Sequence, residues 1–172
     1  MEVKRIPLTQ NRFAIVDAAD YERLSVFKWQ VNINRHTCYA VRTNGRGKIK
    51  MHREILQPPG DMHCDHINHD GLDNRRCNLR ICTPAQNCYN KRPLPNHSSQ
   101  YKGVSFEPVT KKWRAIIKYH GIKIHIGFYE FEQDAAIAYD DLALQLFGEF
   151  AYLNHNFRPE INQWLKQTYL FA

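Results

Sequence analysis

The stretch CDHINHDGLDNRRCNLRICTPAQNCYN (residues 64–90) decides how this sequence folds and works. It is dense in His, Asn, Asp and Arg and has few apolar positions, so it cannot build a hydrophobic core by itself. Its pattern predicts two short strands, at residues 62–66 and 79–83, joined by a polar loop. A helix is expected to begin at Pro84, with Thr83 as its N-cap.

A hairpin followed by a helix would bring Asp65 and His66 close to Asn87. One carboxylate and one carboxamide oxygen suit a single hard cation, Mg²⁺ or Mn²⁺, which keeps several waters and takes phosphate oxygens as further ligands. His66, with an ordinary pKa of about 6.5, is expected to accept a proton from an attacking water. Asn78 is expected to hydrogen-bond either backbone or the His66 ring. Asn90 lies three residues beyond Asn87, and helix register alone leaves open which of the two is the ligand.

The order DH…NL…QNxxN resembles the HNH endonuclease family, in the Asn-terminated variant of phage and intron-encoded homing enzymes. The flanking MHREIL, DNRRCNLR and IPLTQNRFAIVD…W…YAVR are similar to the same family. The resemblance implies a ββα-metal fold in which His66 is the first His of the motif and the general base. It also implies that Asn78 is the central Asn, that Asn87 takes the last position, and that Asp65 is the partner metal ligand.

Arginines and further histidines surround this motif. A guanidinium offers two parallel donors to a phosphate, so three arginines are candidate phosphate clamps, some of which we expect to be structural: Arg75, Arg76 and Arg80. His63 and His69 are expected to contact phosphate rather than to act in catalysis.

The residues before the motif predict mixed short elements. Residues 13–17 and 38–43 have the pattern of strands, and residues 18–27 that of a helix. The Asn-Gly in residues 43–48 indicates a hairpin turn. Residues 51–56 fit a strand or a helix equally well.

The residues after the motif predict a small sheet and one helix. Strands are expected at residues 101–107, 111–120 and 122–129, with turns at Pro108–Thr110 and His120-Gly121. A helix is expected over residues 130–148, ending at Gly148. Its apolar residues at helical spacing are Ala135, Ala138, Tyr139, Leu142 and Leu146.

Nearly all of residues 99–156, in the segments YKGVSFE…KWRAIIK…IHIGFY…DAAIAYDDLALQLFGEFAYLN, resembles the plant ethylene-response-factor (AP-two) type of DNA-binding domain. Strand alternation separates the face of Arg114 and Lys118 from that of Trp113 and Ile117, and the helix can cover only one of them. An exposed basic antiparallel sheet fits a DNA major groove. By position in that family, DNA contacts are implied at or beside Lys102, Ser105, Glu107, Arg114, Ile116, Lys118, Lys123 and His125. Since three plant arginines are replaced, the plant target sequence does not carry over.

Composition limits the class of protein. The 172 residues include 24 Lys+Arg and 17 Asp+Glu, a formal net charge of +7. Residues 1–131 carry +11 and residues 132–172 carry −4, which favours a basic working surface for a polyanion. No apolar run approaches ~20 residues, which excludes a membrane span, and the first residues have no apolar h-region, so a secretory signal is not expected. Five cysteines without a CxxC pair indicate reduced thiols in a cytosol and give a structural zinc site little support.

We therefore expect an α+β protein in which a ββα-metal nuclease domain precedes a three-stranded antiparallel sheet packed on one helix. The expected parts are an HNH domain with an N-terminal extension, a linker, a DNA-binding domain and a tail, at residues 1–92, 93–100, 101–156 and 157–172.

The predicted function is a metal-dependent, site-directed DNA endonuclease related to phage or mobile-element homing. With one active site per chain it is expected to nick double-stranded DNA as a monomer, in the cytoplasm of a host cell, without a membrane or a small-molecule substrate. The alternative is a sequence-specific DNA-binding regulator with a vestigial finger, against which the intact Asp65, His66, Asn78 and Asn87 argue. An RNA-directed protein is disfavoured because no stacking platform for single strands is evident.

Overall fold

The computed structural model describes four stretches of the chain: residues 2–34, 37–45, 47–93 and 98–155. The chain divides into two compact units, Met1–Cys88 and Tyr89–Ala172. The expected tail at 157–172 and residues 94–97 of the expected linker at 93–100 lie outside the described residues. None of the described helices is long and apolar enough to cross a membrane.

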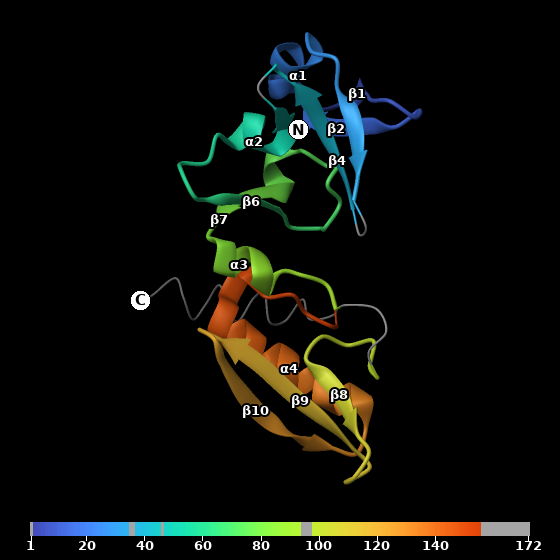
Figure 1. Cartoon of the computed structure of the whole chain (residues 1–172), viewed down its shortest axis with the longest axis vertical. Helices are drawn as coiled ribbons and strands as arrows, with labels where there is room; N and C mark the ends of the chain where they lie inside the picture. The colour runs from blue at the N-terminus through green and yellow to red at the C-terminus, as the bar shows by residue number, and fades with distance from the viewer. Residues whose placement is uncertain (1, 35–36, 46, 94–97, 156–172) are drawn as a thin grey trace. The chain divides into compact units, whose positions relative to one another are not determined.

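The first unit consists of small antiparallel sheets and short helices (Figure 1). In chain order its elements are β1 (Val3–Pro7), β2 (Phe13–Asp17), α1 (Ala18–Ser25), β3 (Gln30–Ile33), β4 (Cys38–Thr43), β5 (Lys48–Lys50), α2 (Met51–Leu56), β6 (His63–His66), the 3-10 turn η1 (Arg76–Asn78), β7 (Leu79–Cys82) and α3 (Pro84–Tyr89). Strand β1 pairs with β2, β4 lies between β3 and β5, and β6 pairs with β7. These sheets and helices are compatible with the expected α+β class.

One hydrophobic core joins these elements. The fully buried Ile6, Val16 and Leu24 come from β1, β2 and α1, and Met51 comes from α2. Leu79 of β7 belongs to the same core, which anchors the β6–β7 hairpin on the rest of the unit. Burying side chains of this size stabilises the fold by about 1.5–3 kcal/mol each.

The strands expected at residues 13–17 and 38–43 are confirmed. The expected helix at 18–27 ends at Ser25, and residues 51–56 form a helix, which their pattern left undecided. The lengths and burial patterns of β1, β3 and β5 explain why sequence patterns did not reveal them. Each has three to five residues and at most one buried side chain, so no alternation develops.

The strand–loop–strand–helix frame also agrees with expectation. Strand β6 faces β7 in antiparallel register, and α3 begins at Pro84. The Gln86 N–H donates to Thr83 Oγ1 at 3.2 Å, and the Thr83 N–H donates to Gln86 Oε1 at 2.8 Å. This reciprocal pair is a capping box, which fixes where the helix starts.

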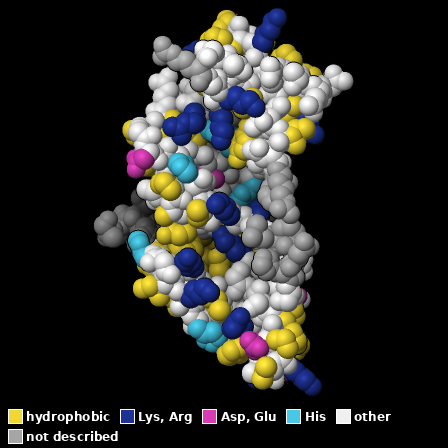
Figure 2. All heavy atoms as spheres, in the orientation of Figure 1, with side chains coloured by type: hydrophobic (Ala, Val, Ile, Leu, Met, Phe, Trp, Pro, Cys, Tyr) yellow, Lys and Arg dark blue, Asp and Glu magenta, His cyan; other side chains and the backbone are white. Residues whose placement is uncertain are grey.

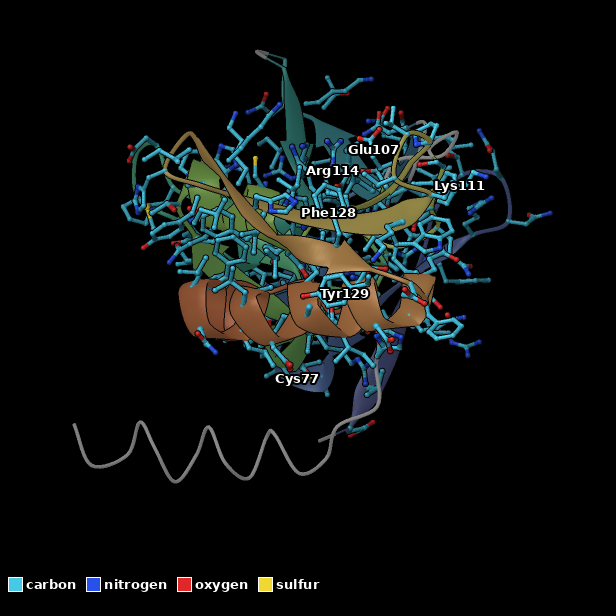
Figure 3. All side chains as sticks on the ribbon, turned by 90° about the horizontal axis from the view of Figure 1, so that it is seen from below. Cys77, Glu107, Lys111, Arg114, Phe128 and Tyr129 are labelled. Atoms are coloured by element: carbon cyan, nitrogen blue, oxygen red, sulfur yellow. The ribbon has the colours of Figure 1, made fainter. Side chains whose placement is uncertain are left out.

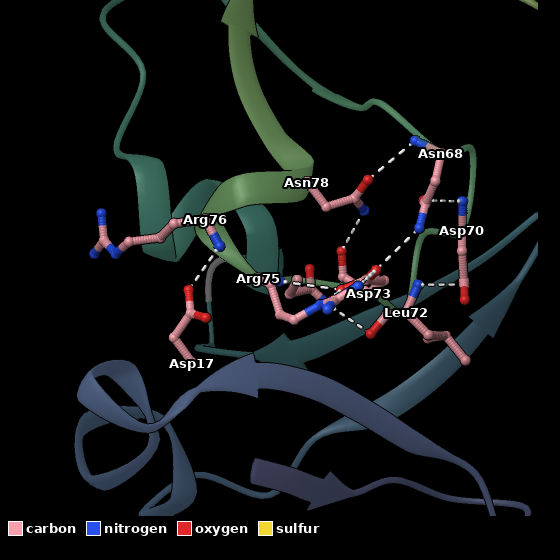
Figure 4. A network of polar contacts seen from close by, with 9 residues as sticks. Asp17, Asn68, Asp70, Leu72, Asp73, Arg75, Arg76 and Asn78 are labelled. Carbon is pink, nitrogen blue, oxygen red and sulfur yellow. Dashed lines mark hydrogen bonds and ion pairs between the residues drawn. The ribbon is translucent and has the colours of Figure 1, made fainter. Parts of the chain in front are cut away.

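The loop between β6 and β7 is attached to strand β2. The Ile15 N–H donates to the Leu72 carbonyl at 2.8 Å, and the Asn74 N–H donates to the Ile15 carbonyl at 2.7 Å. Figure 4 shows the polar contacts that brace this loop, with Asp73 at their centre. The Arg75 guanidinium donates from Nε and Nη2 to the two carboxylate oxygens of Asp73, at 2.7 and 2.6 Å. The loop is therefore a fixed part of the fold despite its polar composition.

Arg76 ties the end of the same loop to helix α1. Its guanidinium donates to both oxygens of Asp20 at 2.7 and 2.9 Å, and its backbone N–H donates to Asp17 at 2.8 Å. Burial raises the pKa of Asp20, but Arg76 and Arg23 outweigh it and hold that pKa below its ordinary range.

The second unit is a three-stranded antiparallel sheet with one long helix across it (Figure 1). Its elements are β8 (Val104–Glu107), β9 (Lys112–Tyr119), β10 (Ile122–Tyr129), α4 (Glu132–Phe147) and the 3-10 turn η2 (Gly148–Phe150). Strand β9 is central. The turns expected at Pro108–Thr110 and at His120-Gly121 are confirmed.

Helix α4 packs on the sheet through a row of residues spaced by four. Its buried row is Ala135, Tyr139, Ala143 and Phe147, with Ala136 beside it. Of the apolar residues expected at helical spacing, Ala135 and Tyr139 are buried and Ala138, Leu142 and Leu146 are half-buried, with Leu142 and Leu146 packed against the core. The helix contacts the sheet along its i, i+4 ridge of side chains, and the small alanines on this ridge let the helix approach the sheet closely.

We predict that Gly103→Ala strongly destabilises the second unit. Gly103 has a φ of +77°, and an added Cβ would lie 2.1 Å from the buried Tyr139 ring and 2.7 Å from the Ile116 carbonyl oxygen. Strain and overpacking together should cost about 3 kcal/mol in urea unfolding. Gly121→Ala is the matched control, because its φ is +84° but nothing lies within 4 Å. It should cost about 1 kcal/mol, and equal losses would contradict the packing assigned to Gly103.

We also predict a pH-dependent effect of Asp73→Asn. The hydrogen bond from Arg75 holds the pKa of Asp73 below its ordinary value of 3.8. The ionised carboxylate therefore stabilises the folded state above pH 3.8, and this contribution disappears as the pH falls through the lower folded-state pKa. The difference in thermal midpoint between wild type and variant should be large at pH 7 and small in acid. Asp61→Asn, at an exposed position, serves as control, and a difference independent of pH would refute the assignment.

Candidate active site

Strand β6 carries the central motif residues on two faces. Successive side chains of a strand alternate, so His63 and Asp65 share one face while Cys64 and His66 share the other. Asp65 and His66 are buried, at 7% and 6% exposure, and His63 is exposed. A buried carboxylate next to a buried imidazole must be held by specific partners, since burying either without one is unfavourable.

The His66 ring packs against two aromatic side chains from other segments. The His52 ring lies 4.8 Å away, edge to face, and the Tyr39 ring lies 5.8 Å away. Burial lowers the pKa of His66, although Asn74 and nearby carboxylates act in the opposite direction. The imidazole is therefore neutral near pH 7 and able to accept a proton.

Asn74 determines which ring nitrogen of His66 carries the hydrogen. The Asn74 Nδ2 donates to the Leu72 carbonyl at 3.1 Å, so its Oδ1 is the atom that faces His66 Nε2, at 3.4 Å. An amide oxygen accepts, so Nε2 must carry the hydrogen and Nδ1 the lone pair. Because the backbone of Asn74 is bonded to Ile15, this orientation is fixed by the attachment of the loop to β2.

Tyr39, His52 and Asn74 were missed as site residues by sequence reasoning. His52 lies on α2 and is buried at 4% exposure, and its Nδ1 has no hydrogen-bond partner among the described residues. Burial and the surrounding cationic groups lower the pKa of His52 to about 3. Burial and the Asp65 carboxylate raise the pKa of Tyr39, so Asp65 lies near this cluster. The sequence signal for His52 was the segment MHREIL. This segment resembles the family, but the resemblance assigned no role to its histidine.

Asp65 is paired with Arg80 across the β6–β7 hairpin. The two residues face each other in the register, and Arg80 donates from Nε and Nη2 to Asp65 Oδ2 at 2.9 and 2.7 Å. Both side chains are largely buried, which makes this a desolvated ion pair. Arg80 therefore orients the Asp65 carboxylate through one of its oxygens.

Asn87 and Asn90 lie in different surroundings. The Asn87 amide nitrogen donates to His63 Nδ1 at 3.1 Å, which sets Asn87 over the β6 face that also carries Asp65. The contact with His63 is made by the Nδ2 atom of Asn87. The other terminal atom of the side chain, Oδ1, is the carboxamide oxygen. Asn90 follows the end of α3 and belongs to the second unit.

Asn78 braces the loop rather than the His66 ring. Its Nδ2 donates to the Asp73 carbonyl at 2.8 Å, and its Oδ1 accepts the Asn68 N–H at 3.0 Å (Figure 4). This is the backbone role that was one of the two expected for it. Arg75 and Arg76 are likewise engaged by Asp73 and Asp20, so both are structural in this state.

The sheet face away from α4 carries most of the residues expected to contact DNA. Opposed residues in the register share a face, and Ser105 and Arg114, Ile116 and His125, and Lys118 and Lys123 are opposed pairs. Figure 2 shows Lys and Arg side chains gathered over this sheet, and Figure 3 shows Arg114 and Glu107 on the side away from α4. The residues of this outer face, in strand order, are Ser105, Glu107, Lys112, Arg114, Ile116, Lys118, Lys123, His125 and Phe128.

Lys102 lies apart from this outer face. Its ammonium donates to the Tyr89 carbonyl at 2.5 Å and lies 5.4 Å from the centre of the Tyr152 ring. Its backbone exchanges two hydrogen bonds with the Asn154 side chain, at 2.6 and 3.1 Å. Lys102 therefore connects the first residues of the second unit, at Tyr89, with its last described residues, at Asn154.

Comparison with known proteins identifies the family. No protein-family model and no solved structure matches this chain. A relative from Acanthamoeba polyphaga mimivirus, described as an uncharacterized HNH endonuclease, is 34% identical over 148 residues. The matched region covers 83% of this chain and 74% of the relative. On this match, over most of both proteins, the chain belongs to the HNH endonuclease family.

Proposed function

We propose that this protein is a metal-dependent DNA endonuclease whose active site is formed by Asp65, His66 and Asn87. The observation that carries the proposal is the arrangement at the end of β6, where the buried imidazole of His66 follows the buried carboxylate of Asp65 in the chain and lies near enough for that charge to act on its pKa, while Arg80 orients the carboxylate. Asn87 adds a carboxamide to the same strand through its contact with His63. Membership of the HNH endonuclease family supports DNA as the substrate.

The donor set fits a hard divalent cation. Among the described residues there is no group of three or more His, Cys, Asp or Glu side chains that could hold a metal. Asp65 and Asn87 would instead supply two protein oxygens, the low number that Mg²⁺ or Mn²⁺ accepts while keeping water and phosphate ligands. A bound cation would supply Lewis-acid stabilisation of the charge that develops on the phosphate and the leaving oxygen.

His66 would act as the general base. In the tautomer that the Asn74 contact favours, Nε2–H would donate to Asn74 Oδ1 and Nδ1 would take the proton of the attacking water. Asn74, Tyr39 and His52 would hold the ring in place during this transfer. With one such site per chain, a monomer would nick one strand of a duplex.

The second unit would direct the nuclease to its target. Its outer face carries Lys112, Arg114, Lys118 and Lys123, of which Arg114 is paired with Glu107 and Lys112 with Glu130. This face and the resemblance of residues 99–156 to plant ethylene-response-factor domains support binding in a duplex major groove. A site-directed nuclease of this kind would suit a phage or mobile-element homing role.

We predict that His66→Ala abolishes cleavage while leaving DNA binding intact. Loss of a general base should lower the rate of nicking of supercoiled phage DNA with Mg²⁺ by roughly 10²–10⁴-fold. His120→Asn, in the exposed β9–β10 turn, is the histidine control and should cleave like wild type. If wild type and His66→Ala both bind DNA and neither cuts it, the protein is a DNA-binding regulator and the enzyme proposal fails.

We predict that Asn87→Ala raises the Mg²⁺ concentration needed for half-maximal cleavage, because an oxygen ligand is removed. Asn90→Ala is the matched comparison, three residues along the chain and in the second unit. Its Mg²⁺ dependence should equal that of wild type, with urea unfolding measured for both variants because Asn90 is buried. The reverse pattern would assign the ligand to Asn90.

A further inference from the structure

A bulge in strand β10 turns Phe128 onto the outer face of the sheet. The register of β10 with β9 shifts between His125, opposite Ile116, and Gly127, opposite Ala115. Ile126 is the extra residue, and its side chain packs with the covered core. Without the shift, His125 and Phe128, three residues apart, would point to opposite faces. With it both lie on the outer face, and their rings are 4.7 Å apart.

Phe128 is an exposed aromatic ring among cationic side chains. It is 46% exposed and lies directly opposite Arg114 on the central strand β9. Figure 3 shows Phe128 and Arg114 on the side of the sheet away from α4, whereas Tyr129 points toward the helix. Ile116, opposite His125, extends the apolar surface beside Phe128. Phe128, Ile116 and His125 therefore form an apolar and aromatic patch on the outer face. The exposed Lys118 and Lys123 lie toward one end of this patch, and toward the other end Arg114 and Lys112 are paired with Glu107 and Glu130 at 3.4 and 3.6 Å.

An apolar patch of this kind needs a complementary group on the DNA. Lysine and arginine side chains bind phosphates, but a phenyl ring gains nothing from a phosphate. In the major groove the apolar group at the base edges is the C5-methyl of thymine, and phenylalanine is one of the side chains that contact it. The charge of the surrounding residues favours the duplex as the occupant of this face.

We propose that Phe128, with Ile116 and His125 beside it, reads a thymine methyl group in the major groove, so that the target contains a T·A pair at the centre of the contact. The inference rests on the proposed function, since it specifies what the second unit recognises. In this proposal Phe128 determines sequence specificity, and the β10 bulge serves to place its ring on the outer face.

The experiment removes the methyl group from the DNA. The full-length protein, with EDTA present to prevent cleavage, would select duplexes from a random-sequence library. Each thymine of a selected duplex would then be replaced in turn by deoxyuridine, which lacks only the C5-methyl. At the contacted position wild type should bind about 4-fold more weakly without the methyl, as expected for one buried carbon.

Protein variants assign the effect to one ring. Phe128→Ala should bind the thymine and deoxyuridine duplexes equally well, with the affinity of wild type for the deoxyuridine duplex or lower. Phe131→Ala is the matched control, because Phe131 is an exposed phenylalanine at the N-cap of α4 and should keep the full dependence on the methyl. Thermal unfolding should be unchanged for both, since each ring is exposed.

Four results would overturn the inference. If wild type binds duplex but tolerates deoxyuridine at every position, or if Phe128→Ala keeps the methyl dependence, the readout is wrong while the proposed function stands. Tighter, Phe128-dependent binding of single strands would identify base stacking instead. If wild type binds no duplex even at low salt, the proposed targeting role fails as well.

Discussion

The attachment of the β6–β7 loop to strand β2 is the constraint on which the site depends. Two backbone hydrogen bonds join Ile15 to Leu72 and Asn74, and the bidentate Asp73–Arg75 pair closes the loop beside them. The same bonds fix the Asn74 amide, and that amide fixes the tautomer of His66. Leu72 gives this polar loop one half-buried apolar contact with the core, and these hydrogen bonds restrict the conformations of the residues around it, on which the orientation of the imidazole depends.

Part of the positive charge behind the net charge of +7 is held in ion pairs within the fold. Arg75, Arg76 and Arg80 are each held by a carboxylate of the first unit, and two of these carboxylates are almost fully buried. These arginines serve the fold and the orientation of Asp65 more than they serve a polyanion. On the outer face of the second unit, Lys118 and Lys123 are exposed, so the charge there is of the kind that attracts phosphate.

Local patterns predicted much of the fold and part of the site. Alternation, turn residues and the Thr83 cap predicted β2, β4, the β6–β7 hairpin and α3, because each depends on neighbours in the sequence. Spacing predicted the apolar residues of α4, but which of them are fully buried depends on the sheet that the helix meets. Likewise, residues 51–56 became a helix whose buried Met51 and Ile55 join the core.

The sequence by itself determined the order of motif residues, the family resemblance and the placement of Asp65 and His66 on one short strand, because chemistry and spacing are local properties. Only the tertiary structure decided what touches them. Tyr39, His52 and Asn74 reach His66 from three different segments, and Arg80 reaches Asp65 through the strand register. In the same way, a one-residue bulge decided that Phe128 lies among the cationic side chains. Such contacts depend on backbone pairing and packing between distant residues, which no short window of sequence contains.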